Sequence, residues 1–298
     1  MKKIIARYFY SPICSESFAS LDRLRRLFHT MEEHVHFEFF NTTEDKIDSK
    51  FPWFAKEKEL LDTLEGIGTK PLVYGKLFIE GKEILGFPPS KKMLEKVLRD
   101  YDIHFPQQAY QITYKKVDRQ QWEILEDRLS ITKYDKKSLR DVCLVCTEHN
   151  PFLEEREYMK EKWNEHEAGK ENYLEDKLQE ENVLGFVAYY EDHPVGFIEA
   201  FPLKLAAKLG FPVSNIDLNG LMITCLHIRK EVSGHGIASK LIKEINEEAR
   251  KRNYQSIEVL AFPDKNNWHP ISLYQKHGFV SVKDIEDLEV LSLMGKVL

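Results

Sequence analysis

The stretch EVSGHGIASKLI at residues 231–242 decides the fold of the C-terminal part of this chain. An apolar run at residues 221–229 precedes it and predicts a strand, and the apolar residues that follow recur with helical spacing. A strand, a Gly-x-Gly corner and a helix bring backbone N–H groups together at a helix N-terminus. Such a corner can bind an anion such as a pyrophosphate. Gly234 and Gly236 allow close approach because neither has a Cβ atom.

Taken alone, this corner fits a plain tight turn as well as a phosphate site. The third glycine of the dinucleotide-binding fingerprint is absent, and so is the lysine of a Walker motif. The corner therefore gains meaning only from the sequence around it.

The surrounding sequence predicts a mixed α/β unit over residues 107–298. Two strands at 183–191 and 195–201 are joined by a turn at 192–194, and a further strand is expected at 110–117. After the corner and its helix come a strand at 256–261, a short helix at 271–277 and a last strand at 288–294. The connection at 202–220 has no regular pattern, and it is either a lid over the site or a long loop.

A second stretch, NWHPISLYQKHGF at residues 267–279, follows about thirty residues after the corner. The two stretches together resemble the GNAT N-acetyltransferase superfamily, whose strand and Gly-x-Gly corner bind acetyl-coenzyme A. The resemblance covers roughly residues 183 to the C-terminus. LMITCLHI at 221–228 and EEREYMKEKW at 154–163 are most similar to the YoaP-type subgroup. The sequence departs from the family at Ser233, where a basic residue is common, and at Pro270, where alanine is usual.

The resemblance implies an acetyl-coenzyme A-dependent N-acetyltransferase that needs no metal. Backbone amides of Leu226, His227 and Ile228 would hold the acetyl and pantetheine groups. Tyr274 would protonate the leaving thiolate, although it also fits a core aromatic, and Asn267 would either cap a helix or contact the cofactor. The pyrophosphate would lie on the amides of Ser233, Gly234, His235, Gly236, Ile237 and Ala238.

The base that takes the amine proton stays open between Glu199, His227, Glu258 and water, since strand alternation sends some of these side chains to the wrong face. His227 also fits a packed or surface histidine. The acceptor is expected to be the amine of a small molecule or peptide. Residues 154–181 carry eleven acidic and five basic residues, which predicts either a solvated helix pair or an acidic rim that attracts a cationic amine. Phe152, Met159 and Trp163 form a helical stripe there.

The first 106 residues predict a separate unit of β-α-β-α-β-β-α order. Strands are expected at 3–10, 34–40, 72–74 and 77–79, with helices at 18–28, 56–64 and 91–98. Cys14 lies between the first strand and helix, where a helix N-terminus lowers a thiol pKa. This pattern resembles the thioredoxin-like fold, with Cys14 at the attacking position, Ser17 at the resolving position and Pro71 at the cis-proline.

Cys14 is therefore a candidate reactive thiol, for thiol binding or a mixed disulfide. The alternative is that this unit retains the fold as a scaffold without thiol chemistry. A rival function follows from it: a thiol-binding or redox-sensing module whose C-terminal unit binds coenzyme A as a regulatory ligand. The remaining cysteines, Cys143, Cys146 and Cys225, are expected to be buried. Cys143 and Cys146 have a metal-like spacing, but only His149 is near as a further ligand.

Composition excludes several classes. The 298 residues carry 43 basic and 49 acidic side chains, a net charge of −6 that argues against a nucleic-acid partner. No apolar run approaches the roughly 18 residues of a membrane span, and the start at Met1 lacks the pattern of a signal peptide. Four scattered cysteines make no disulfide scaffold. We expect a reduced, cytoplasmic, two-domain α/β protein without a membrane partner.

Overall fold

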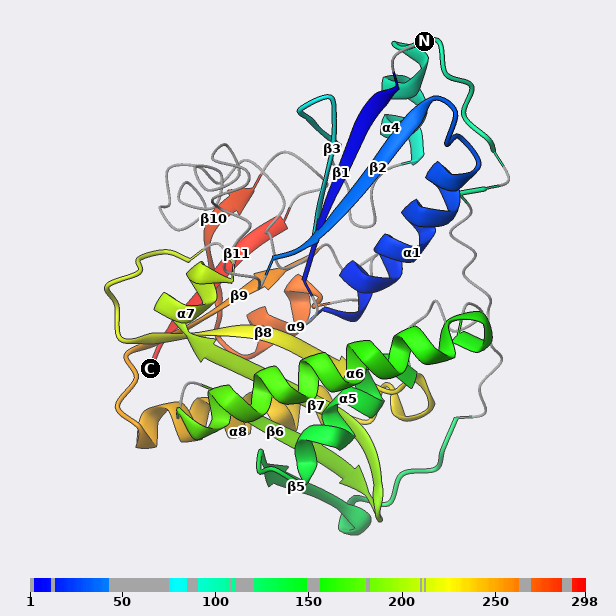
Figure 1. Ribbon diagram of the computed structural model, residues 1–298. Coiled ribbons are helices and arrows are strands. Elements are labelled where there is room, and N and C mark those ends of the chain that lie inside the picture. The colour runs from blue at the N-terminus through cyan, green and yellow to red at the C-terminus, as the bar shows by residue number, and fades with distance from the viewer. Residues whose placement is uncertain are drawn as a thin grey trace.

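The computed structural model describes residues 3–11, 14–42, 75–84, 91–107, 109–110, 121–148, 156–180, 183–209, 211, 213–262, 269–285 and 291–298. Among these residues the strands form two sheets, one of four and one of seven strands. Figure 1 shows the small sheet formed by the N-terminal elements beside the large sheet formed by the rest of the chain.

The small sheet has the order β2-β1-β3-β4. β1 (Ile4–Tyr10) pairs in parallel with β2 (Val35–Asn41), while β3 (Lys76–Ile79) pairs antiparallel with β1 and with β4 (Lys82–Ile84). The N-terminal part also contains the helices α1 (Ser15–His29) and α4 (Lys91–Arg99). These elements confirm the strands predicted at 3–10, 34–40 and 77–79 and the helices at 18–28 and 91–98. The helix expected at 56–64, the strand at 72–74 and Pro71 lie outside the described residues.

The large sheet has the order β10-β11-β9-β8-β7-β6-β5. Along the chain its strands are β5 (Leu129–Lys133), β6 (Leu184–Tyr190), β7 (His193–Pro202), β8 (Gly220–Ile228), β9 (Ser256–Ala261), β10 (Val280–Ile285) and β11 (Leu291–Val297). Every neighbouring pair is antiparallel except β8 and β9, which run parallel. A parallel pair needs a crossover, and the corner and helix predicted from residues 231–242 supply it.

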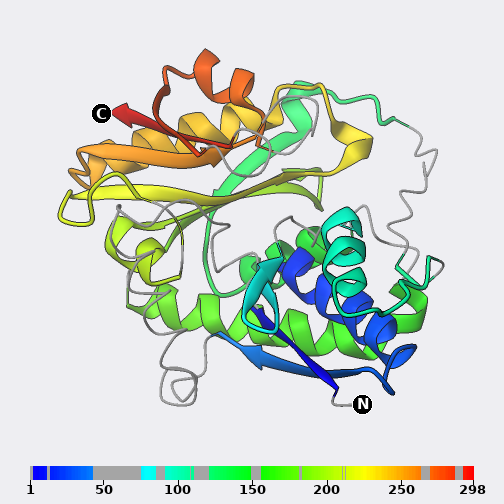
Figure 2. The same cartoon turned by 90° about the horizontal axis from the view of Figure 1, so that it is seen from above.

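Helices cover both faces of this sheet. α5 (Ser138–Glu148), α6 (Arg156–Gln179) and α7 (Leu203–Lys208) lie on one face, and α8 (Ile237–Lys251) and α9 (Ile271–Lys276) lie on the other. Figure 2 shows α8 on one side of the sheet and α6 on the opposite side, together with the N-terminal elements. Two short 3-10 helices, η3 (Glu126–Arg128) and η5 (Lys230–Val232), precede β5 and α8.

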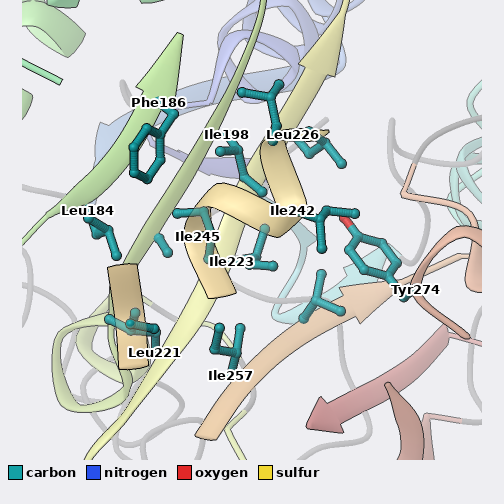
Figure 3. Close-up of a cluster of buried hydrophobic side chains, with 14 of the residues drawn as sticks. Leu184, Phe186, Ile198, Leu221, Ile223, Leu226, Ile242, Ile245, Ile257 and Tyr274 are labelled. Atoms are coloured by element: carbon teal, nitrogen blue, oxygen red, sulfur yellow. The ribbon is translucent and has the colours of Figure 1, made fainter. Parts of the chain in front are cut away.

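Two hydrophobic cores separate along β7, because successive side chains of a strand point to opposite faces. Phe197 and Phe201 pack into the core under α5 and α6. Ile198 and Ala200 pack into the core under α8. Figure 3 shows strand side chains such as Leu221 and Ile257 beside Ile242, Ile245 and Tyr274 in this core.

Some predicted boundaries were wrong. The turn before β7 lies at Glu191, whose φ is 55°, and at Asp192, so that β7 starts at His193 rather than at residue 195. The connection at 202–220 contains α7. The strand expected at 288–294 continues to Val297 as β11, and residues 288–290 lie outside the described part. Tyr110 is not in a strand, and residues 111–117 lie outside the described part.

The N-terminal part contacts the rest of the chain at the N-terminus of α1. Cys14 packs against the core under α5 and α6, together with Tyr173 and Cys225. The start of α1 therefore lies against the α6 face of the large sheet. Among the described residues, no helix has both the length and the apolar composition needed to cross a membrane.

Candidate active site

The parallel strands β8 and β9 pair along only part of their length and then separate. Gly220 to Ile223 pair with Ser256 to Val259, and no pairing between the two strands continues beyond this point. β8 nevertheless stays paired with β7 as far as Ile228, and β9 stays paired with β11 as far as Ala261. A register shift next to Glu199 accompanies the separation. The second half of β8 thus turns toward the end of β9 an edge that pairs with no described strand.

The glycine corner at the start of α8 has the geometry of an anion site. Gly234 and Gly236 have φ angles of 86° and 74°, a left-handed conformation that favours glycine, and a Cβ atom at either would meet nothing within 4 Å. Among the described residues, the backbone N–H groups of residues 234–239 have no hydrogen-bond acceptor. Unpaired amides and the positive end of a helix of 15 residues suit a pyrophosphate. These residues therefore fit coenzyme A, whereas Asn267 lies outside the described part.

Tyr274 and His269 lie at the parting of the strands. The Tyr274 side chain is fully buried, stacks edge-on against Phe279, and its Oη lies 3.0 Å from Nδ1 of His269. Burial and the neighbouring Cys225 raise the pKa of Tyr274 well above its usual value. Burial and the neighbouring His227 lower the pKa of His269 to about 3. At neutral pH the pair is therefore a protonated phenol beside an uncharged imidazole.

The three β8 amides predicted to hold the acetyl group are not equivalent. The N–H of Leu226 donates to Nε2 of His269 at 3.1 Å, so His269 occupies it. Strand alternation turns the N–H of His227 toward β7, as it does for Arg229, which donates to Val195 O. The N–H of Ile228 points the same way as that of Leu226, and among the described residues it has no acceptor.

The three candidate bases also lie in different settings. Glu258 is on the closed half of the parallel pair, and both of its carboxylate oxygens accept hydrogen bonds from Ser214. Burial raises the pKa of Glu258.

Glu199 is buried and lies opposite Cys225 in the pairing of β7 with β8. Its Oε1 accepts a hydrogen bond from Thr224 Oγ1 at 3.0 Å, while its Oε2 has no partner among the described residues. His227 is half-buried and stacks on Phe197.

The α6 face beside Glu199 contains a second polar group, Lys170. Its Nζ lies 3.6 Å from Cys146 Sγ and 5.1 Å from the centre of the Phe197 ring. Burial alone would lower the pKa of Lys170, and the neighbouring acidic groups Cys146 and Glu199 reverse that shift. Burial also raises the pKa of Cys143 to about 12.

The structure describes the three cysteines that were expected to be buried. Cys143 and Cys146 are buried as predicted, while Cys225 is only half-buried. Within the described ranges, no group of histidine, cysteine and carboxylate side chains could hold a metal ion. Leu174 is buried in the core under α6, whereas the side chains of Phe152, Met159 and Trp163 lie outside the described part.

Sequence reasoning missed His269 and Lys170. His269 lies inside the quoted stretch at 267–279, five residues before Tyr274, so its place in the motif was a usable signal. Its contact with Leu226 spans 43 residues, and no local pattern reveals such a contact. Lys170 is one of five basic residues in a highly charged segment, where nothing distinguishes a buried lysine from an exposed one.

The sequence model of the acetyltransferase (GNAT) family matches residues 147–279. No curated protein matches the sequence.

Several solved structures are similar to part of the chain. PaiA N-acetyltransferase from Thermoplasma acidophilum, in complex with coenzyme A, is 18% identical with a TM-score of 0.42, over 57% of this chain and 99% of that one. Ribosomal-protein-alanine N-acetyltransferase from Brucella melitensis has 18% identity and a TM-score of 0.41, over 57% and 99% of the two chains. A GNAT family acetyltransferase from Elizabethkingia anophelis with acetyl-CoA bound has 15% identity and a TM-score of 0.37, over 58% and 100%. TM-scores this low assign no activity. The family match covers less than half of the chain: residues 147–279 are similar to the acetyltransferase (GNAT) family.

Proposed function

We propose that this protein is an acetyl-coenzyme A-dependent N-acetyltransferase that acetylates an amine of a small molecule or peptide. The observation that carries the proposal is the parting of β8 and β9, with the unpaired amides of α8 nearby and Tyr274 buried at the parting. The match of residues 147–279 to the GNAT family supports it.

Binding would involve two sets of backbone amides. The amides of residues 234–239 would hold the pyrophosphate, because they are unpaired and lie at the positive end of α8. The N–H of Ile228 would donate to the carbonyl oxygen of the acetyl group, where negative charge develops during attack. The N–H of Leu226 could join it only after release from His269.

Acetyl-coenzyme A supplies an activated acetyl thioester. Tyr274 would give its proton to the departing sulfur, since its raised pKa keeps the hydroxyl protonated at neutral pH. The cofactor cradle and Tyr274 belong to the α8 side of the sheet, so the amine would approach from the α6 side.

Glu199 is the base we propose for the amine. It projects to the α6 side, and one carboxylate oxygen has no partner among the described residues. Glu258 is less suited, because Ser214 occupies both of its oxygens on the closed half of the strand pair. The excess of acidic residues at 154–181 favours a cationic acceptor.

For the N-terminal part we propose a thioredoxin-like domain over residues 1–106, followed by the acetyltransferase domain over 107–298. The sheet order β2-β1-β3-β4, with β1 and β2 parallel, supports this assignment, as does Cys14 at the N-cap of α1. Ser17 is buried, and its hydroxyl accepts a hydrogen bond from the N–H of Ser11 at 3.0 Å. The cytoplasmic location stays a prediction.

The test is an assay of purified protein with acetyl-coenzyme A and a panel of polyamines, aminoglycosides, amino acids and peptides. Thiol release is followed by absorbance, and acetylated products are identified by mass spectrometry. We expect at least one amine to gain an acetyl group, with Glu199→Gln slowing the reaction about 10²-fold or more and Glu258→Gln slowing it less. Binding of acetyl-coenzyme A without acetylation of any amine would instead favour the regulatory, thiol-binding alternative.

A further inference from the structure

His269 is held at both ring nitrogens in a nearly closed environment. Its Nε2 lies 3.1 Å from the backbone nitrogen of Leu226, and its Nδ1 lies 3.0 Å from Oη of Tyr274. The residue is only 3% exposed. These contacts join β8 to α9 across the parting of β8 and β9.

The backbone partner fixes the tautomer of the ring. A backbone N–H can only donate, so Nε2 must offer its lone pair to Leu226. The ring is uncharged at neutral pH, because burial and the neighbouring His227 lower its pKa to about 3. Its single proton therefore lies on Nδ1, and Nδ1–H donates to Oη of Tyr274.

This arrangement decides where the Tyr274 proton points. Oη accepts the hydrogen bond from His269, so the hydroxyl proton of Tyr274 cannot be shared with that ring. Among the described residues, Oη has no second partner. With the other tautomer the hydroxyl would donate to Nδ1, and Nε2–H would face the N–H of Leu226.

The backbone at His269 is held in a strained conformation. Its φ is 45°, in the left-handed region that non-glycine residues rarely adopt. The carbonyl of His269 accepts from Phe262 N at 2.9 Å, and the carbonyl of Phe262 accepts from Ile271 N at 3.0 Å. Such strain persists only where surrounding contacts hold it, and it concentrates at functional sites.

We propose that His269 is a positioning residue that keeps the Tyr274 proton directed at the leaving sulfur. The proposal rests on the function proposed above. As the amine nitrogen bonds to the acetyl carbon, the carbon–sulfur bond breaks and its electron pair goes to sulfur. Sulfur takes the Tyr274 proton, and Nδ1–H of His269 stabilises the phenolate left behind. The ammonium loses its proton to the base or water, and Tyr274 regains one from solvent.

The first test needs no substrate. Nitrogen NMR of the free protein, labelled at the histidine rings, reports which ring nitrogen carries a proton. We expect His269 to show a protonated Nδ1 and a bare Nε2, unchanged from about pH 5 to pH 9, because its pKa is about 3. A proton on Nε2, or titration in this range, would overturn the proposal.

The second test is a set of variants of His269 and Tyr274. His269→Asn keeps an N–H donor near the Nδ1 position, and we expect thiol release within about tenfold of the parent protein. His269→Leu removes the donor, so we expect a loss of about 10²-fold in kcat with an unchanged KM for acetyl-coenzyme A. The double variant His269→Leu with Tyr274→Phe should be no slower than Tyr274→Phe alone, because each change removes the same proton donation to sulfur.

Additive losses in the double variant would show that His269 acts only on the fold and would contradict the proposal. His104→Asn, at an exposed histidine of the N-terminal part, serves as the control. A parent protein that acetylates no amine, yet shows the expected tautomer, would refute the proposed function and leave the assignment of the ring proton intact. The two failures are thus distinguishable.

Discussion

At residue 274 a tyrosine hydroxyl lies in a fully buried site beside an uncharged imidazole. Burial penalises the phenolate, which raises the pKa of Tyr274 and keeps its proton in place at neutral pH. The raised pKa means that the hydroxyl is protonated in the resting protein, so a proton is present for the departing thiolate.

Replacing Tyr274 by Phe tests this role. We expect thiol release to fall by about 10²-fold or more, while the affinity for acetyl-coenzyme A is unchanged. The lost hydrogen bond to His269 should lower the free energy of unfolding by about 1 kcal/mol. Calorimetry and a thiol-release assay measure both quantities, and equal activity would leave Tyr274 as a core aromatic.

Cys14 is expected to be the most reactive of the four thiols. It lies at the N-cap of α1, whereas burial raises the pKa of Cys143 to about 12 and also raises that of Cys225. We therefore expect iodoacetamide to label Cys14 first below pH 7, as located by peptide mapping. Earlier labelling of Cys143, Cys146 or Cys225 would contradict the view of the N-terminal part as a thiol module.

Residue identity predicted part of this site and missed the rest. The motif around Tyr274 marked the tyrosine, and apolar neighbours predicted burial of Cys143 and Cys146. The function of His269 depends on Leu226, 43 residues away, and that distance is closed only by the tertiary fold.

Among the single elements, α8 is the one whose start we propose to bind the pyrophosphate of acetyl-coenzyme A. A Gly236→Glu change would place a carboxylate beside amides expected to meet phosphate. Gly236→Ala is the matched control, since at a φ of 74° both side chains suffer the same backbone strain of about 1–2 kcal/mol.

We expect acetyl-coenzyme A at 100 times its Kd to stabilise the parent protein by about 2.7 kcal/mol. The Ala variant should keep most of the resulting shift in Tm, and the Glu variant should lose it. A full shift in the Glu variant would mean that the pyrophosphate binds elsewhere.

Elements with strong periodicity were predicted well and short ones were not. The apolar face of α8 and the apolar runs of β8 and β9 gave boundaries within two residues. α7 has only six residues, less than two full turns, and is too short for a helical period to stand out. β5 lies at the edge of the sheet with mostly exposed side chains, so it lacks an apolar run.

For the whole molecule, the strand order of the large sheet was beyond sequence reasoning. Pairing of β9 with β11 and of β8 with β7 depends on long-range register, which no local pattern specifies. The strand, corner and helix predicted at residues 221–242 nevertheless supply the crossover of β8 and β9, the parallel pair that positions the site.

Acid stability offers a prediction for the whole molecule. His269 has a folded-state pKa of about 3 against an ordinary value of 6.5. Its contribution to the free energy of unfolding is complete above pH 6.5 and is lost as the pH falls toward 3. In this range the unfolded chain binds a proton at His269 that the folded chain does not bind. The loss is about 1.4 kcal/mol per pH unit.

Urea unfolding of the parent protein and of His269→Asn, between roughly pH 7 and pH 4, measures this slope. The variant lacks the titrating ring, so we expect the free energy of unfolding to fall less steeply than in the parent. Parallel curves for the two proteins would show that His269 is accessible to protons in the folded state.

Hydrogen–deuterium exchange with and without acetyl-coenzyme A tests most directly the claim that the cofactor binds where β8 leaves β9 and α8 begins. The unpaired amides of residues 234–239 and the amide of Ile228 on β8 should exchange more slowly with the cofactor bound, because they gain acceptors and lose solvent. The closed half of the pair, at 256–259, and helix α4 in the N-terminal part should be unchanged. Unaltered exchange at 234–239, or protection confined to the N-terminal sheet, would contradict the account.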